Sequence, residues 1–164
     1  MAKKSKAGAK AKSSGDGEGV KLVAKNNRAK FDYELLQKYE AGLVLLGTEI
    51  KSIRAGHVTL QEAYCRFESG ELFLIKMHIP EYEMRGYVTH EPTRKRKLLL
   101  HRSEIRRIEQ KIKERGLTLI PVRLYLKGGR AKIEIALAKG RKRHDKRQAL
   151  ASKEAKSEIR KAVR

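Results

Sequence analysis

The chain has 164 residues, of which 40 are Lys or Arg and 19 are Asp or Glu, so its formal net charge at pH 7 is +21. A chain this basic repels itself, and a polyanion is its expected partner. No apolar run is long enough to cross a membrane, and no apolar stretch of a secretory signal follows the basic start. The only cysteine, Cys65, has no partner for an internal disulfide. We therefore expect a cytoplasmic protein with no membrane partner.

Charge and apolar content divide the chain into three parts. Residues 1–27 are rich in Lys, Ala, Gly and Ser and predict a disordered basic arm. Residues 28–140 hold nearly all the β-branched and aromatic side chains and predict the folded domain. Residues 141–164 form a basic tail whose apolar residues recur at helical spacing but are few. We expect this tail to become helical only against RNA.

The start of the folded domain is predicted to form one short helix followed by extended segments. A helix is predicted from Tyr33 to Glu40, with Asp32 as its cap and Gly42 at its end. Extended segments are predicted on both sides of Gly47, over Leu43–Leu46 and Thr48–Arg54.

Two β-hairpins follow, each marked by period-two alternation around a turn. The first turns at Ser69-Gly70, and its predicted apolar face consists of Ala63, Cys65, Phe67, Phe73, Ile75, Met77 and Ile79. The second turns at Gly128-Gly129 between residues 122–127 and 131–137. Pro121 has no N–H to donate and is expected at a strand edge or a bulge.

One helix is predicted between the hairpins. It starts at Ser103 as N-cap, carries the apolar stripe of Ile105, Ile108 and Ile112, and ends at Gly116. Several short strands with flanking helices predict a mainly β protein, and we expect an OB-like antiparallel β-barrel. Periodicity alone does not distinguish this barrel from a sandwich.

Motifs for catalysis are missing from the sequence. The five histidines have no metal-ligand spacing, and Cys65 has no CxxC partner or activating neighbour. No P-loop, GxSxG or GxGxxG sequence occurs. We therefore predict no enzymatic activity, no catalytic or metal-binding residue and no cofactor.

Two cationic runs favour RNA binding. Arg94–Lys97 precedes the apolar Leu98–Leu100 and is interpreted as a phosphate clamp, with a solvated loop as the alternative. Lys139–Arg147 follows the last predicted strand and is interpreted as a second RNA-binding segment. The alternative interpretation is a flexible basic tail that attracts RNA nonspecifically. Without a helix-turn-helix or zinc-finger signature, shaped or single-stranded RNA is favoured over a DNA major groove.

Several sequence blocks occur in a characteristic order: Asn27–Ala29, Tyr39–Leu43, Gly47–Gly56, Arg96–Leu100, Gly116–Thr118, and Ala138–Gly140 leading into His144–Arg147. Through these blocks, residues 27–164 resemble the SmpB family, the tmRNA-binding (SsrA-binding) proteins of trans-translation. This resemblance implies an OB-type barrel that binds the tRNA-like domain of tmRNA at its D-loop and elbow, with one copy per tmRNA.

The resemblance also implies which residues contact RNA. Family contact positions fall on Glu40, Leu99 and His101, where His101 replaces the more common Asn. The full expected RNA-binding set is Asn27, Arg28, Glu40, Lys51, Arg54, Arg96, Lys97, Leu99 and His101.

The tail is implied to act on the ribosome. It would enter the decoding centre and empty mRNA channel of the small subunit of the 70S ribosome, alongside the alanyl-tmRNA complex bound to EF-Tu. His144 would stack on rRNA, and Asp145–Arg147 would support accommodation. The tail set is Lys139, Arg141, Lys142, Arg143, His144, Asp145, Lys146 and Arg147. The expected function is ribosome rescue by trans-translation, in which stalled nascent peptides are tagged for degradation. A ribosomal or ribosome-assembly rRNA-binding protein and a metal-dependent nuclease are the alternatives.

Overall fold

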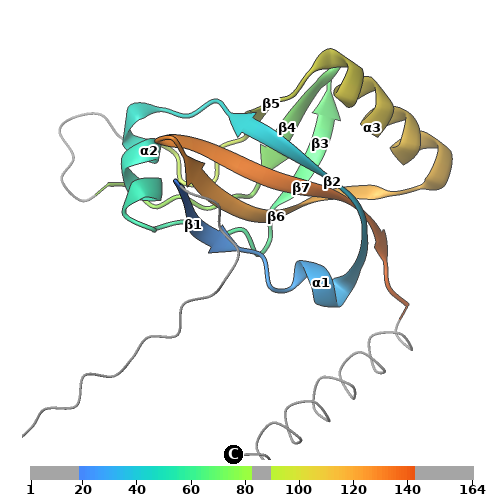
Figure 1. The fold of residues 1–164 in the computed structure, drawn as a ribbon, viewed down its shortest axis with the longest axis horizontal. Coiled ribbons are helices and arrows are strands. Elements are labelled where there is room, and N and C mark those ends of the chain that lie inside the picture. The colour runs from blue at the N-terminus through green and yellow to red at the C-terminus, as the bar shows by residue number, and fades with distance from the viewer. Residues whose placement is uncertain (1–18, 83–89, 143–164) are drawn as a thin grey trace, which may run out of the picture.

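The computed structural model of this chain describes residues 19–82 and 90–142 (Figure 1). Its strands are β1 (Val20–Lys25), β2 (Tyr33–Leu43), β3 (Tyr64–Glu68), β4 (Glu71–Ile75), β5 (Arg96–Leu99), β6 (Thr118–Lys127) and β7 (Arg130–Gly140). Its helices are α1 (Ala29–Asp32), α2 (Gly47–Arg54) and α3 (Arg102–Arg115). None of these helices is long and apolar enough to span a membrane.

The antiparallel strands close into a ring. Going round, β6 pairs with β3, then β4, β5, β2 and β7 follow, and β7 pairs with β6 again. The join between β3 and β6 is the single pair Cys65–Leu119, and β1 continues along the same edge of β6. Closure leaves few free sheet edges and confirms the predicted antiparallel barrel.

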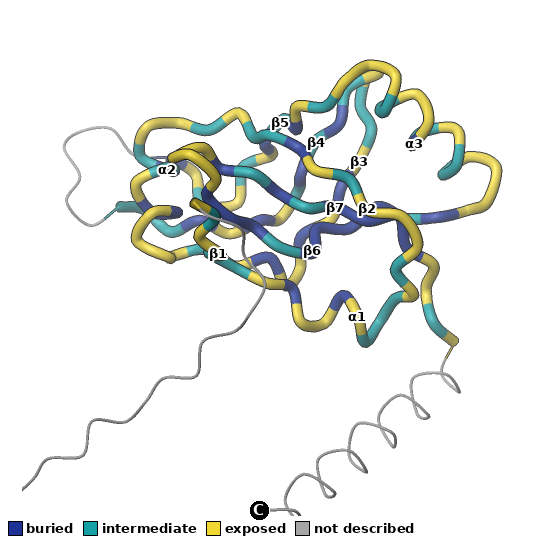
Figure 2. Tube along the Cα trace, in the orientation of Figure 1, coloured by how far each residue is buried: buried dark blue, intermediate teal, exposed yellow. Residues whose placement is uncertain are grey.

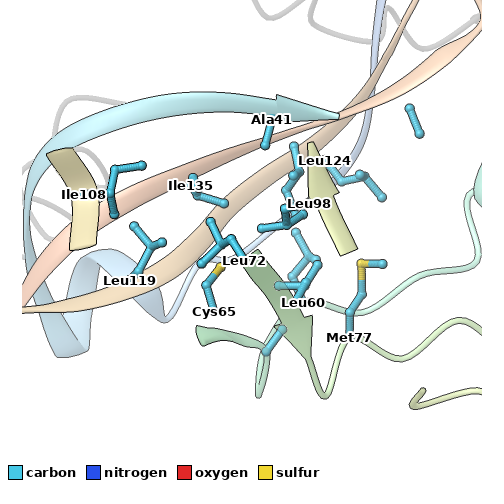
Figure 3. Packing of buried hydrophobic residues seen from close by; sticks show 14 of the residues in the cluster. Ala41, Leu60, Cys65, Leu72, Met77, Leu98, Ile108, Leu119, Leu124 and Ile135 are labelled. Atoms are coloured by element: carbon cyan, nitrogen blue, oxygen red, sulfur yellow. The ribbon is translucent and has the colours of Figure 1, made fainter. Parts of the chain in front are cut away.

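The core fills the inside of this ring (Figures 2 and 3). Side chains from β2, β4, β5, β6 and β7 meet there, as Ala41, Leu72, Leu98, Leu124 and Ile135 show in Figure 3. Helix α3 adds the fully buried Ile108. Buried and more exposed residues alternate along β3, β4 and β5, whereas β6 and the second half of β7 are buried almost continuously.

Both predicted hairpins are confirmed, with one change of face. In β3–β4, Leu72 and Leu74 are fully buried, whereas Phe73 and Ile75 are only half-buried. Lys76 has φ +58°, which reverses the alternation, so the prediction holds again for Met77 and Ile79.

The predicted bulge at Pro121 is also confirmed. The register of β6 against β7 shifts between Pro121 and Arg123. The bulge accommodates a residue without an N–H in a strand that pairs with β7 on both sides of it.

The predicted helix over residues 33–40 and the predicted strand over residues 48–54 are wrong, whereas the extended backbone predicted for Leu43–Leu46 is found at Leu43, the last residue of β2, and at Leu46. Residues 33–43 form β2 rather than a helix, and Gly47–Arg54 form α2 rather than a strand. The apolar residues of β2 fit either period, and pairing with β7 along almost the whole strand selects the extended form. Leu46 is the N-cap of helix α2, and its backbone N–H donates to Glu49 Oε2 at 2.7 Å. The Glu49 carboxylate thereby satisfies one of the free N–H groups at the start of the helix, which stabilises the first turn.

Helix α3 is confirmed with a different first residue. Its N-cap is His101 rather than Ser103, because the carboxylate of Glu104 accepts the backbone N–H of His101 at 3.2 Å. Its end at Gly116 is as predicted, with φ +59°.

The folded part begins before the predicted boundary at residue 27. Val20–Lys25 form β1, in which Leu22 pairs with Tyr125 of β6. The composition of the arm does not reveal a strand whose partner lies far along the chain. Residues 1–18 and 143–164 lie outside the described residues, so a disordered arm and an RNA-induced helical tail stay predictions there.

Candidate nucleic-acid interface

The outer face of β2, β7 and β6 carries a polar cluster around Glu40. The hydroxyl of Tyr125 donates to Glu40 Oε2, and Lys132 Nζ lies 3.8 Å from Glu40 Oε1. The hydrogen bond from Tyr125 lowers the pKa of Glu40, and the charges of Lys127, Lys132 and Arg123 add to this against the effect of burial. Burial, reinforced by Glu40, raises the pKa of Tyr125. At neutral pH, Glu40 is therefore ionised and accepts a hydrogen bond from the protonated hydroxyl of Tyr125.

The strand register extends this cluster into a row across five strands. Leu22 pairs with Tyr125, Tyr125 with Lys132, Lys132 with Gly42, and Gly42 with Leu99. Two apolar residues lie at its ends, with 45% of Leu22 and 51% of Leu99 exposed. Leu99 lines one surface depression together with Arg130 and Lys132, so an apolar contact for a base or sugar lies beside cations that suit its phosphates.

Gly42 allows Leu99 to lie close to the backbone of β2. A Cβ at residue 42 would be 3.3 Å from the Cβ of Leu99. Only two residues farther along the chain, His101 is exposed at the start of α3. The structure therefore brings Glu40 and Leu99 onto one face. His101 follows Leu99 closely in the sequence.

The cationic run Arg94–Lys97 is not the open phosphate clamp that the sequence indicated. Each of its cations is paired with a carboxylate: Arg94 and Arg96 with Glu49, Lys95 with Glu68, and Lys97 with Glu71. Arg96 has no exposed surface, so it supports the fold and does not reach RNA in this conformation. Lys97 remains half-buried at the surface.

The other predicted basic residues lie around the barrel. In α2, Lys51 is exposed with its Nζ 5.8 Å from the ring of Tyr82, and Arg54 donates to the carbonyl of Gly129 at 3.3 Å. Asn27 and Arg28 are exposed just before α1, which lies on the opposite side of the barrel from β5 in Figure 1. These two residues therefore do not join the face that carries Leu99.

The described part of the tail leaves the barrel along β2. Gly140 still pairs with Tyr33, and the N–H of Arg141 donates to the carbonyl of Asp32 at 3.0 Å. Lys139 and Lys142 are exposed and Arg141 is half-buried. The predicted tail residues that lie outside the described residues are Arg143, His144, Asp145, Lys146 and Arg147.

Comparison with known proteins decides the family. The family model described as SmpB protein matches residues 23–164. The chain belongs to the SmpB family. It is 49% identical over 156 residues to the SsrA-binding protein of Thermobifida fusca, which covers 95% of this chain and 98% of the relative. It is 53% identical over 144 residues to the SsrA-binding protein of Carboxydothermus hydrogenoformans, with 88% and 97% covered.

A solved SmpB structure agrees with the fold. The work named "tmRNA-SmpB: a journey to the center of the bacterial ribosome" contains a chain that is 46% identical to this one. The two structures match with a TM-score of 0.64 over 79% of this chain and 94% of the solved chain. Membership of SmpB, an RNA-binding family without enzymatic activity, confirms the sequence resemblance and the prediction of a non-enzyme.

Sequence reasoning missed three residues whose side chains make long-range contacts in the folded domain. Tyr125 and Lys132 occupy the outer positions of the second hairpin, but only the register with β2 brings them to Glu40. Asn26 falls in the predicted arm, yet its buried Nδ2 donates to the carbonyls of Leu60 and Pro121, each at 3.2 Å. No local pattern announces such long-range partners.

Acidic and thiol groups do not form a reactive site in the described ranges 19–82 and 90–142. No group of three His, Cys, Asp or Glu side chains in these ranges is arranged to hold a metal ion. Cys65 is buried in the barrel, and burial raises the pKa of its thiol. A thiol held protonated in this way is a packing residue.

Proposed function

We propose that this protein binds tmRNA and brings it to stalled ribosomes for trans-translation, so that the stalled peptide is tagged for degradation. The observation that carries this is the exposed pair of Leu99 and the ionised Glu40 on a cationic barrel face, in a chain about half identical to SsrA-binding proteins. The +21 charge supplies the general affinity for a polyanion.

The barrel face supports recognition of shaped RNA. Cations around the row bind phosphates and set the orientation, whereas Glu40 accepts hydrogen bonds from base or ribose donors. Leu99 offers an apolar surface for a base or sugar. We assign this face to the tRNA-like domain of tmRNA, at its D-loop and elbow, with one protein per tmRNA. The variant His101 keeps a hydrogen-bonding side chain at the third family position.

The tail supports the ribosomal half of the function. We assign residues 139–147, which start at the last two residues of β7, to the decoding centre and the vacant mRNA channel of the 70S ribosome. Bound mRNA would exclude a polycationic tail by volume, so entry of the tail reports a stalled ribosome. We assign the protein to the cytoplasm. We also assign it to the complex in which EF-Tu binds alanyl-tmRNA.

Sequencing the RNA that copurifies from cells tests this proposal. Enrichment of tmRNA over bulk rRNA supports it, and enrichment of rRNA alone points instead to a ribosomal or ribosome-assembly protein. In solution, the purified chain should prefer the isolated tRNA-like domain to an unrelated hairpin of equal length. Equal affinity for the two RNAs would refute the proposal.

A further inference from the structure

A groove lies between α3 and the turn that joins β3 to β4. Its floor is β5, with Leu98 and Leu99, and one wall is Ser69-Gly70. The other wall is the first two turns of α3, where Arg102 and Arg106 lie one helical turn apart and are exposed. Figure 1 shows α3 at the β3–β4 end of the barrel, and Figure 2 shows much of it exposed. We call this the α3 groove.

The charges of the α3 groove do not cancel. Its two carboxylates are both paired with lysines, Glu71 with Lys97 and Glu109 with Lys113, the latter at 2.9 Å. Neither arginine forms an ion pair with a residue in the described part of the chain. The groove therefore holds two uncompensated guanidinium groups, the side chain that binds phosphate oxygens bidentately.

Leu99 connects the α3 groove to the row on the barrel face. It lines the groove and also a second depression that contains Gly42, Arg130 and Lys132. A strand whose base or sugar rests on Leu99 therefore has the α3 groove on one side and the Glu40 cluster on the other. This continuity identifies a nucleic-acid backbone, rather than an isolated anion, as the fitting occupant.

We propose that the α3 groove binds the phosphodiester backbone of RNA, with Arg102 and Arg106 holding phosphates of the strand that contacts Leu99. This surface extends the proposed tmRNA-binding function and rests on it. It assigns an RNA-binding role to a helix that the sequence indicated only as a packing element.

The test is the salt dependence of binding by the full chain. The probe is the transcribed tRNA-like domain of tmRNA, titrated between about 50 and 200 mM KCl with the parent and with R102A/R106A. Each phosphate contact contributes about 0.7–0.9 to the slope of log affinity against log salt. The double variant should lower the magnitude of this slope by about 1.4–1.8. The ratio of parent affinity to variant affinity should therefore fall by roughly tenfold as KCl rises across this range.

Two matched variants separate a local contact from net charge. R107A/R115A removes the same charge from the same helix at exposed positions that do not line the groove, and it should change the slope much less. R102K/R106K keeps the charge and should keep the slope. Thermal denaturation of each protein checks its folding, which the exposed groove arginines should not affect.

A slope unchanged in R102A/R106A, or lowered equally in R107A/R115A, overturns the assignment of the groove. The proposed function is judged separately, by the preference of the parent for the tRNA-like domain over an unrelated hairpin. If that preference is absent, the slopes measured on the hairpin still decide whether the groove binds RNA backbone.

Discussion

Arg96 and Glu49 form an ion pair inside the protein, although they are 47 residues apart in the sequence. Arg96 Nε lies 2.8 Å from Glu49 Oε1, and neither side chain has any exposed surface. Other N–H groups of Arg96 donate hydrogen bonds to the carbonyl of Met77 at 2.6 Å and to the carbonyl of Pro92 at 3.0 Å. The pair thus fixes α2 against β5, the strand that presents Leu99.

We expect Glu49→Gln to destabilise the fold strongly, because it leaves a buried guanidinium charge without its counter-ion. Loss of one partner from a buried pair costs about 3–5 kcal/mol. Urea denaturation measures the change. Glu62→Gln is the control, since its partner Arg28 lies 3.4 Å away in an exposed pair and should contribute less than about 1 kcal/mol. Similar losses in the two variants would contradict the structural role of Glu49.

Glu49 also predicts how stability changes in acid. Burial by itself raises its pKa, but hydrogen bonds from Arg94, the Leu46 N–H and Arg96, with the Arg96 charge, outweigh it and lower the pKa overall. Such a carboxyl stabilises the fold above its unfolded pKa of about 4.3, and this contribution is lost as pH falls through the folded value. The urea midpoint should therefore drop below about pH 4.5, and less steeply in Glu49→Gln. Parallel curves for the two proteins would count against this link.

Two adjacent leucines separate folding from binding. Leu98 is 1% exposed and Leu99 is 51% exposed. We expect Leu98→Ala to lose about 2–5 kcal/mol of stability, whereas Leu99→Ala should change stability little and weaken binding to the tRNA-like domain. Denaturation and RNA titration of both variants check this. Full affinity in Leu99→Ala would remove Leu99 from the interface.

Tyr125→Phe tests the polar cluster. The hydrogen bond from Tyr125 is the main cause that lowers the pKa of Glu40. Its removal should raise that pKa toward the ordinary value, which NMR titration of the Glu40 carboxyl measures. Affinity for the tRNA-like domain should fall as Glu40 loses its anchor. Tyr64→Phe, at an exposed tyrosine of β3, is the matched control and should shift neither quantity.

Removing the tail should separate tmRNA binding from ribosome rescue. The cut belongs after Lys142, because Gly140 pairs with Tyr33 and Arg141 bonds to Asp32 within the fold. The shortened chain should bind the tRNA-like domain with nearly parental affinity and should not support tagging on stalled ribosomes. A tagging assay in cells that lack the full-length protein measures this. Tagging at the parental level would show that the tail is dispensable.

The sequence alone determined the features that depend on neighbouring residues. Alternation around Ser69-Gly70 and Gly128-Gly129 predicts the two hairpins, because turn glycines and period-two burial act over a few residues. The stripe that ends at Gly116 predicts α3 for the same reason. The sequence blocks that resemble the SmpB family singled out Glu40 and Leu99 as expected RNA contacts.

Tertiary structure decided what depends on distant partners. Residues 33–43 became a strand because β7 offers a hydrogen-bonding edge, and local periodicity does not contain that edge. Arg96 became a core residue because Glu49 and backbone carbonyls compensate its buried charge. Tyr125 reached Glu40 only through strand register. The free energy of a long-range contact depends on both partners together. The local sequence pattern around one partner therefore does not predict the contact.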